Sequence, residues 1–269
     1  MDEKQRLREE DLQRLRGLRL MDDDFLGVVF DDNFKATELL LNIILGRNDM
    51  IVTRVVGQRE IKNPNGRSVR LDVHAVDSTN KQYDIEVQRE DRGAGAQRAR
   101  FNSSMLDTRM LKPGEKFSQL ADSYVIFITE NDVLGKNLSL YHVDRIVRET
   151  NELFCDGSHI IYVNGAYKND KDPVGKLMHD FRCTEADDMN YSVLSDCVRY
   201  FKESEGGIEA MCKVMEEMRD QAATAAKIEE RRNFAVSLWN DGMKDVERIA
   251  RLANMTPEEV REAVGIKTA

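Results

Sequence analysis

Two acidic residues, Asp72 and Glu86, stand on neighbouring segments in which apolar and polar side chains alternate. A period of two is typical of a strand with one buried face, so segments 70–77 and 83–88 are predicted strands. The polar residues 78–81 between them are typical of the turn of a hairpin. A hairpin brings the two carboxylates together, and such an oxygen-rich site suits a hard divalent cation.

The same pattern has a second interpretation. Asp84, Glu86 and Gln88 are spaced two residues apart, so their side chains point to one face of the strand. That face could be a solvated surface, with Ile85 and Val87 turned toward the core. The spacing alone leaves both interpretations open.

The segments around this hairpin predict the elements that hold it in place. An amphipathic helix over 34–46 is followed by a β-branched run, 51–56, and by a turn with the sequence Asn-Pro-Asn-Gly at 63–66. The elements expected after the hairpin are one helix and three strands, over 96–111, 124–129, 138–143 and 159–163. This order is typical of an α/β fold with a mixed central sheet flanked by helices.

The chain is predicted to have three parts. A charged helical extension covers 1–20, an α/β domain covers 21–200, and an all-helical region covers 206–269. The last two helices, over 244–252 and 257–264, form a compact pair. Helix-turn-helix DNA-binding units have this form, and so do small helical hairpins, so the pattern leaves both functions open.

Composition bounds the function classes. The chain of 269 residues has a formal net charge of −9, whereas most dedicated nucleic-acid binders are basic, so any DNA contact needs a local positive patch. No apolar run approaches the roughly 18 residues of a membrane span. The four cysteines are widely spaced and form no C-x-x-C pair, and the N-terminus has no apolar signal segment. We therefore expect a cytoplasmic protein without a membrane partner.

The order of the acidic residues and of the elements around them is similar to that of a known nuclease superfamily. A helix with Glu38, a strand, then Asp72 and the sequence Glu86-x-Gln88 before an arginine-bearing helix resemble the PD-(D/E)XK nuclease superfamily. Within this superfamily the chain resembles more closely the Rpn-like, transposase-associated branch of recombination-promoting nucleases. In that branch glutamine replaces the last lysine of the motif. It covers about residues 21–200. The supporting segments are 84–88, 97–107 and 111–115.

The resemblance implies a restriction-endonuclease-like fold and a Mg²⁺-dependent DNA endonuclease linked to transposition, recombination or mobile elements. Asp72 and Glu86 would bind the metal together with the backbone carbonyl of Val87, and Mn²⁺ could replace Mg²⁺. A carboxylate-bound Mg²⁺ neutralises a phosphate oxygen and supplies hydroxide near neutral pH. Gln88 would orient a water without the positive charge of a lysine. Many nucleases of this fold pair to cut both strands, so the resemblance also allows a homodimer.

Three residues outside the motif are further candidates. Glu38 resembles the extra helix-borne carboxylate of many superfamily members, and its other interpretation is a solvated residue in the first turns of a helix. Arg98 and Arg100 suit DNA binding because a guanidinium group can donate two parallel hydrogen bonds to phosphate. Ion pairing along the helix is the alternative for both arginines.

Two further hypotheses belong to other classes of protein. A nuclease-like fold could bind DNA or a protein partner without cutting, and the acidic net charge and Gln88 leave room for this function. The C-terminal helices could instead serve as an oligomerisation or adaptor module.

Overall fold

The computed structural model describes residues 3–61 and 69–266, so the turn predicted at 63–66 lies outside the described residues. The chain divides into two compact units, Met1–Met211 and Cys212–Ala269. The first unit contains the α/β fold and the second contains only helices.

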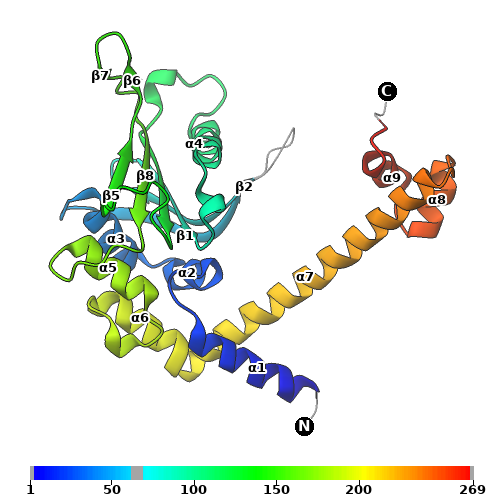
Figure 1. Ribbon diagram of the computed structural model, residues 1–269, viewed down its shortest axis with the longest axis horizontal. Helices are drawn as coiled ribbons and strands as arrows, with labels where there is room; N and C mark the ends of the chain where they lie inside the picture. Colours follow the sequence, from blue (N-terminus) through cyan, green and yellow to red (C-terminus); the bar gives the residue numbers. More distant parts are fainter. Residues whose placement is uncertain (1–2, 62–68, 267–269) are drawn as a thin grey trace. The chain divides into compact units, whose positions relative to one another are not determined.

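A six-stranded mixed sheet forms the centre of the first unit (Figure 1). In spatial order its strands are β1 (Val52–Ile61), β2 (Val69–Asp77), β3 (Gln82–Gln88), β4 (Ser123–Thr129), β8 (Ser158–Asn164) and β5 (Leu140–Val143). Strands β3, β4 and β8 pair parallel, and the other neighbours pair antiparallel. The predicted α/β fold with a mixed sheet is confirmed.

Helices cover both faces of this sheet (Figure 1). Helix α4 (Ala96–Met110) packs on one face, where Ala99 and Leu106 share a buried cluster with Phe127 of β4. Helices α2 (Asp23–Phe30) and α3 (Phe34–Leu45) pack against the first strands from the other face. The sheet is therefore buried on both sides, which places polar side chains of β2 and β3 inside the protein.

Helix α3 has the ends that its sequence predicts. The side chain of Asn33 accepts a hydrogen bond from the amide of Ala36 at 3.1 Å, as an N-cap residue does. Gly46 follows the last turn with a left-handed backbone, φ 63°, which glycine adopts at little cost.

Helix α2 is absent from the sequence-based expectations. It has only 8 residues and contains Gly27 and two valines, all of which favour helix weakly. Burial of Phe25, Leu26 and Phe30 stabilises it instead. A Cβ atom on Gly57 of β1 would lie 2.1 Å from the Gly27 carbonyl oxygen, so α2 lies directly on β1.

The other elements of the first unit surround this core. A small hairpin, separate from the main sheet, leaves Leu153 and Phe154 exposed. These elements are α1 (Glu3–Gly17), β6 (Ile146–Val147), β7 (Glu152–Leu153), α5 (Pro173–Arg182) and α6 (Ser192–Glu203).

The second unit is helical, as expected. It contains most of α7 (Glu205–Asn240), followed by α8 (Val246–Ala253) and α9 (Pro257–Ala263). Ile249 and Val260 form its core with neighbouring apolar residues. Thr256 caps α9 through a reciprocal pair of hydrogen bonds with Glu259.

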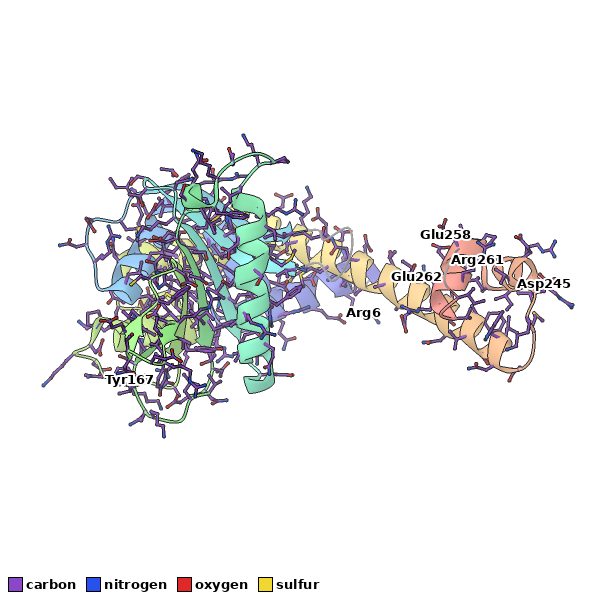
Figure 2. All side chains as sticks on the ribbon, turned by 90° about the horizontal axis from the view of Figure 1, so that it is seen from above. Arg6, Tyr167, Asp245, Glu258, Arg261 and Glu262 are labelled. Atoms are coloured by element: carbon purple, nitrogen blue, oxygen red, sulfur yellow. The ribbon has the colours of Figure 1, made fainter. Side chains whose placement is uncertain are left out.

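The exposed side of α9 is mainly acidic. Figure 2 shows Glu258 and Glu262 on the surface of this helix, and Glu259 is exposed as well, whereas Arg261 is only half-buried. Negative charge on the second helix of the pair opposes contact with DNA phosphates. The two functions that the sequence leaves open for this pair, a DNA-binding unit and a small helical hairpin, both remain predictions.

Candidate active site

The predicted acidic site lies where β2 and β3 stop pairing. Their regular pairs end at Val73 and Ile85. Beyond this point the carboxylate of Asp72 accepts a hydrogen bond from the amide of Val87 at 3.0 Å. Gln58 on β1 has a positive φ of 50° beside the same point, so the sheet is irregular on both sides of Asp72.

The carboxyl groups here are buried. Asp72 is 8% exposed, and Asp84 and Glu86 are 0% exposed. Burial, increased by the nearby Glu86 charge, raises the pKa of Asp72 to about 8. Burial also raises the pKa of Glu86, with a further contribution from Asp84, while Arg98 acts in the opposite direction. At neutral pH the charged forms of these buried carboxyl groups are unfavourable, so each group is stabilised either by a proton or by a nearby cation.

Helix α4 supplies the polar groups that face this pair of strands. Arg98 forms an ion pair with Glu86, donates to the Gly93 carbonyl at 3.2 Å, and lies 5.7 Å from the ring centroid of Phe127. Asn102 donates to the carboxylate of Asp84 at 3.0 Å. The structure therefore brings together Arg98 and the two predicted carboxylates.

Two buried carboxylate oxygens lack a hydrogen-bond donor. Asp84 Oδ1 and Glu86 Oε1 are buried, and no described residue donates to them when both carboxyl groups are ionised; a hydrogen bond to Asp84 raises the pKa of Glu86. An unpaired oxygen in the interior destabilises a protein, and oxygen is the donor that Mg²⁺ and Mn²⁺ prefer. Asp72 and Glu86 are both buried carboxyl groups, and Glu86 Oε1 lacks a donor, so this pair fits a hard divalent cation.

The fit rests on two carboxylates. Among the side chains that the structure describes, no group of three or more His, Cys, Asp and Glu could hold a metal ion. Mg²⁺ is commonly held by one or two carboxylates and keeps several waters, so two side chains are enough.

Gln88 lies beside the ion pair of Arg98. A Cβ atom on Gly93 would stand 1.9 Å from Gln88 Oε1 and 3.7 Å from Arg98 Nη1. The absence of a side chain at Gly93 therefore leaves the space that the Gln88 carboxamide occupies. The structure places the predicted water-orienting residue within this group.

The contacts of two other predicted site residues, Glu38 and Arg100, lie outside the group formed by Asp72, Glu86, Gln88 and Arg98. The carboxylate of Glu38 accepts a hydrogen bond from the amide of Val52 at 2.9 Å. Val52 pairs with Asp77, five residues along β2 from Asp72, which is about 16 Å of strand. Arg100 is exposed on α4, and its carbonyl accepts a hydrogen bond from Ser104.

A further carboxylate that acts on Asp72 comes from α2, a helix that the sequence pattern does not predict. The charge of Asp23 raises the pKa of Asp72 further. The neighbouring Asp24 accepts hydrogen bonds from Gln58 at 3.1 Å and from Arg70 at 3.2 Å. Three consecutive aspartates before an apolar segment are a signal for the start of a helix, and this signal could have located α2.

A charged network fixes the start of α2 to the ends of the parallel strands. Arg19 donates to both oxygens of Glu130, which follows β4, at 2.8 and 3.1 Å. Arg89, which follows β3, donates to Asp22 at 2.8 Å. Ligand sites in open α/β sheets commonly lie at this carboxyl end of the parallel strands.

The comparisons with known proteins identify the family. Residues 31–174 match the model of the PD-(D/E)XK nuclease family transposases. The chain belongs to this family. The match runs through every strand of the main sheet, so the restriction-endonuclease-like fold is confirmed, and membership supports a nuclease role associated with transposition. No curated protein and no solved structure matches the chain.

PD-(D/E)XK nucleases generally use divalent metals, and their family suggests DNA as the substrate. No helix in the described part of the chain combines the length and apolar character of a membrane span.

Proposed function

We propose that this protein is a Mg²⁺-dependent DNA endonuclease in which Asp72 and Glu86 hold the metal. The observation that carries the proposal is the buried pair of carboxyl groups, with no donor for Glu86 Oε1 when Glu86 and Asp84 are both ionised. A buried carboxylate of this kind gains most from a bound cation. Family membership supports the reaction class.

The backbone of Val87 would complete the protein ligands. The N–H and C=O of one strand residue point to the same edge of the strand. Because the Val87 amide donates to Asp72, its carbonyl also faces that edge, close to the two carboxylates. When bound, a divalent cation polarises a phosphate oxygen and lowers the pKa of a coordinated water.

The remaining residues position the reaction. Gln88 Oε1 can accept a hydrogen bond from the attacking water and so fix its direction, without adding charge. Arg98 holds the Glu86 carboxylate, and its side chain is still 39% exposed. We propose that Arg98 and Arg100 contact DNA phosphates from α4. Glu38 remains a prediction, and Asp23 is the carboxylate that we place nearer to the metal.

Cleavage of DNA tests the proposal. Supercoiled, linear and single-stranded DNA are incubated with the full chain in Mg²⁺, in Mn²⁺ and in EDTA. We expect cleavage with either metal, none in EDTA, and none with Asp72→Ala or Glu86→Ala variants whose circular dichroism matches that of the parent. Asp170→Ala, which changes an exposed aspartate, is the matched control. Equal cleavage by Asp72→Ala and the parent would contradict the site.

A second function has a specific observation in its favour. Arg98 already forms an ion pair with Glu86, so part of the negative charge is neutralised without a metal. A protein of this kind could bind DNA or a protein partner without cutting. It would bind DNA equally well in EDTA and in Mg²⁺, and calorimetry would show no Mg²⁺ binding.

A further inference from the structure

A second polar region on the α4 side of the sheet has the opposite charge. It is a cavity of about 330 Å³ over β1 and β2, and neither Asp72 nor Glu86 lines it. Its walls come from β1, β2, the turn before β3, β3 itself, the last turns of α4 and the segment before β4. The polar residues among them are Thr53, Arg54, Arg59, His74, Asn80, Gln82, Arg109 and Gln119.

Arg59 is held in this cavity by a neutral partner. Its guanidinium group lies 2.7 Å from Nδ1 of His74, which is 2% exposed. A guanidinium group can only donate, so Nδ1 accepts, and the other ring nitrogen donates to Gln82 Oε1 at 2.8 Å. His74 is therefore neutral and fixes the direction of Arg59 without neutralising its charge.

The positive charges in the cavity act on one another. Burial lowers the pKa of Arg59, and the nearby charges of Arg54 and Arg109 lower it further. Arg54 is exposed and makes no ion pair with the described residues. No aspartate or glutamate stands among the described residues that line the cavity. A half-buried guanidinium group in this setting is stabilised by an anion.

We propose that this cavity binds the phosphate group of a phosphorylated ligand. Arg54 and Arg59 donate to the phosphate oxygens, Arg109 adds positive potential, and the amides of Gln82 and Gln119 offer neutral hydrogen bonds. The volume reaches the lower end of the usual range for small-molecule sites, about 300–1,000 Å³, which is enough for a nucleotide-sized group. The phosphate belongs to a free nucleotide or to a nucleic-acid strand, and both offer the same chemistry.

This inference goes beyond the proposed endonuclease and does not depend on its metal. The cavity is lined by other residues than Asp72 and Glu86. Binding to it can be measured in EDTA, where no metal-dependent cleavage occurs. A chain that fails to cut DNA can still bind phosphate here, and a chain that cuts can fail to do so.

Isothermal titration calorimetry of the full chain in EDTA tests the proposal. The probes are inorganic phosphate, thymidine monophosphate and a short single-stranded oligonucleotide. We expect the parent to bind, and Arg54→Gln and Arg59→Gln to weaken the affinity about tenfold each, as loss of one charge-assisted hydrogen bond does. Arg148→Gln, which changes an exposed arginine outside the cavity, should bind like the parent.

The outcomes separate the two sources of phosphate. Similar affinity for the mononucleotide and the oligonucleotide assigns the site to a free nucleotide, and at least tenfold tighter binding of the oligonucleotide assigns it to a strand. Absence of binding by the parent to all three probes overturns the proposal, and so does parent-like binding by Arg54→Gln. Because Arg54 is exposed, that variant decides the question even if Arg59→Gln unfolds.

Discussion

The two polar regions beneath and beside α4 differ in how their charge is balanced. The acidic region buries Asp72 and Glu86 and gives them Arg98 as a charged partner. The basic cavity gives Arg59 a neutral histidine as its partner. Buried charge is normally paired within the protein, so an imbalance of either sign indicates the sign of a ligand. By this argument one region suits a cation and the other an anion.

The largest expected effect separates function from stability in the acidic region. Glu86→Gln keeps the shape of the side chain and removes its charge, so we expect metal-dependent cleavage to fall at least about a hundredfold. The metal-free variant should melt close to the parent, because the loss of the buried charge favours folding while the loss of the ion pair with Arg98 opposes it. Kinetic assays and calorimetric melting check both results. Glu149→Gln, on an exposed residue, is the control.

A lower melting temperature together with full activity in Glu86→Gln would mean that Glu86 stabilises the fold and does not hold a metal. Such a result would remove the contrast between the two regions.

The second prediction concerns pH. The pKa of the Asp72 carboxyl is about 8 in the folded chain, against an ordinary value near 4. Between these values the folded chain retains a proton that the unfolded chain releases, so the stability of the metal-free protein should fall as pH rises from about 5 to 8. Melting curves in EDTA should show a decrease of several degrees. Mg²⁺ should reverse it, and a pH-independent melting temperature would contradict the buried acidic group.

The third prediction sharpens the role of Gln88. Gly93→Ala places a methyl group on the Gln88 carboxamide and should displace it. We expect kcat for DNA cleavage to fall about tenfold while metal affinity stays within twofold, since the carboxylates are untouched. Gly17→Ala is the control, because its added Cβ would have no atom within 4 Å beyond its chain neighbours and the backbone of its own helix. Equal losses of metal binding and rate would show that the substitution disturbs the whole site.

The smallest effect is expected at the surface of α4. Arg100 is exposed, so Arg100→Gln should weaken DNA binding only about threefold and leave the maximal cleavage rate unchanged. Fluorescence anisotropy at two salt concentrations measures this change. A variant whose affinity and salt dependence both equal those of the parent would exclude Arg100 from the DNA surface.

The local part of the acidic site follows from the sequence. Alternating residues predict the hairpin and the proximity of Asp72 to Glu86, and the helix that follows carries Arg98. These features depend on neighbours along one or two strands. Their burial does not follow, because it depends on α2 and α4 covering opposite faces of the sheet.

The features that the sequence pattern does not predict depend on contacts between elements far apart in the chain. Helix α2 is too short and too rich in β-branched residues to show a helical pattern, so its aspartates are not placed beside Asp72. Glu38 has the spacing of a helix-borne ligand, but α3 directs it to Val52 at the other end of β2. Arg59 and His74 lie 15 residues apart in sequence and meet only because β1 and β2 pair.

Binding of Mn²⁺ tests the central claim most directly. Calorimetry of the full chain, without DNA, compares the parent with Asp72→Asn and with Asp170→Asn as the exposed control. The account predicts saturable Mn²⁺ binding by the parent and by Asp170→Asn, and a loss of at least about tenfold in affinity for Asp72→Asn. Absence of Mn²⁺ binding by the parent, or equal affinity in all three proteins, would contradict a metal centre at Asp72 and Glu86.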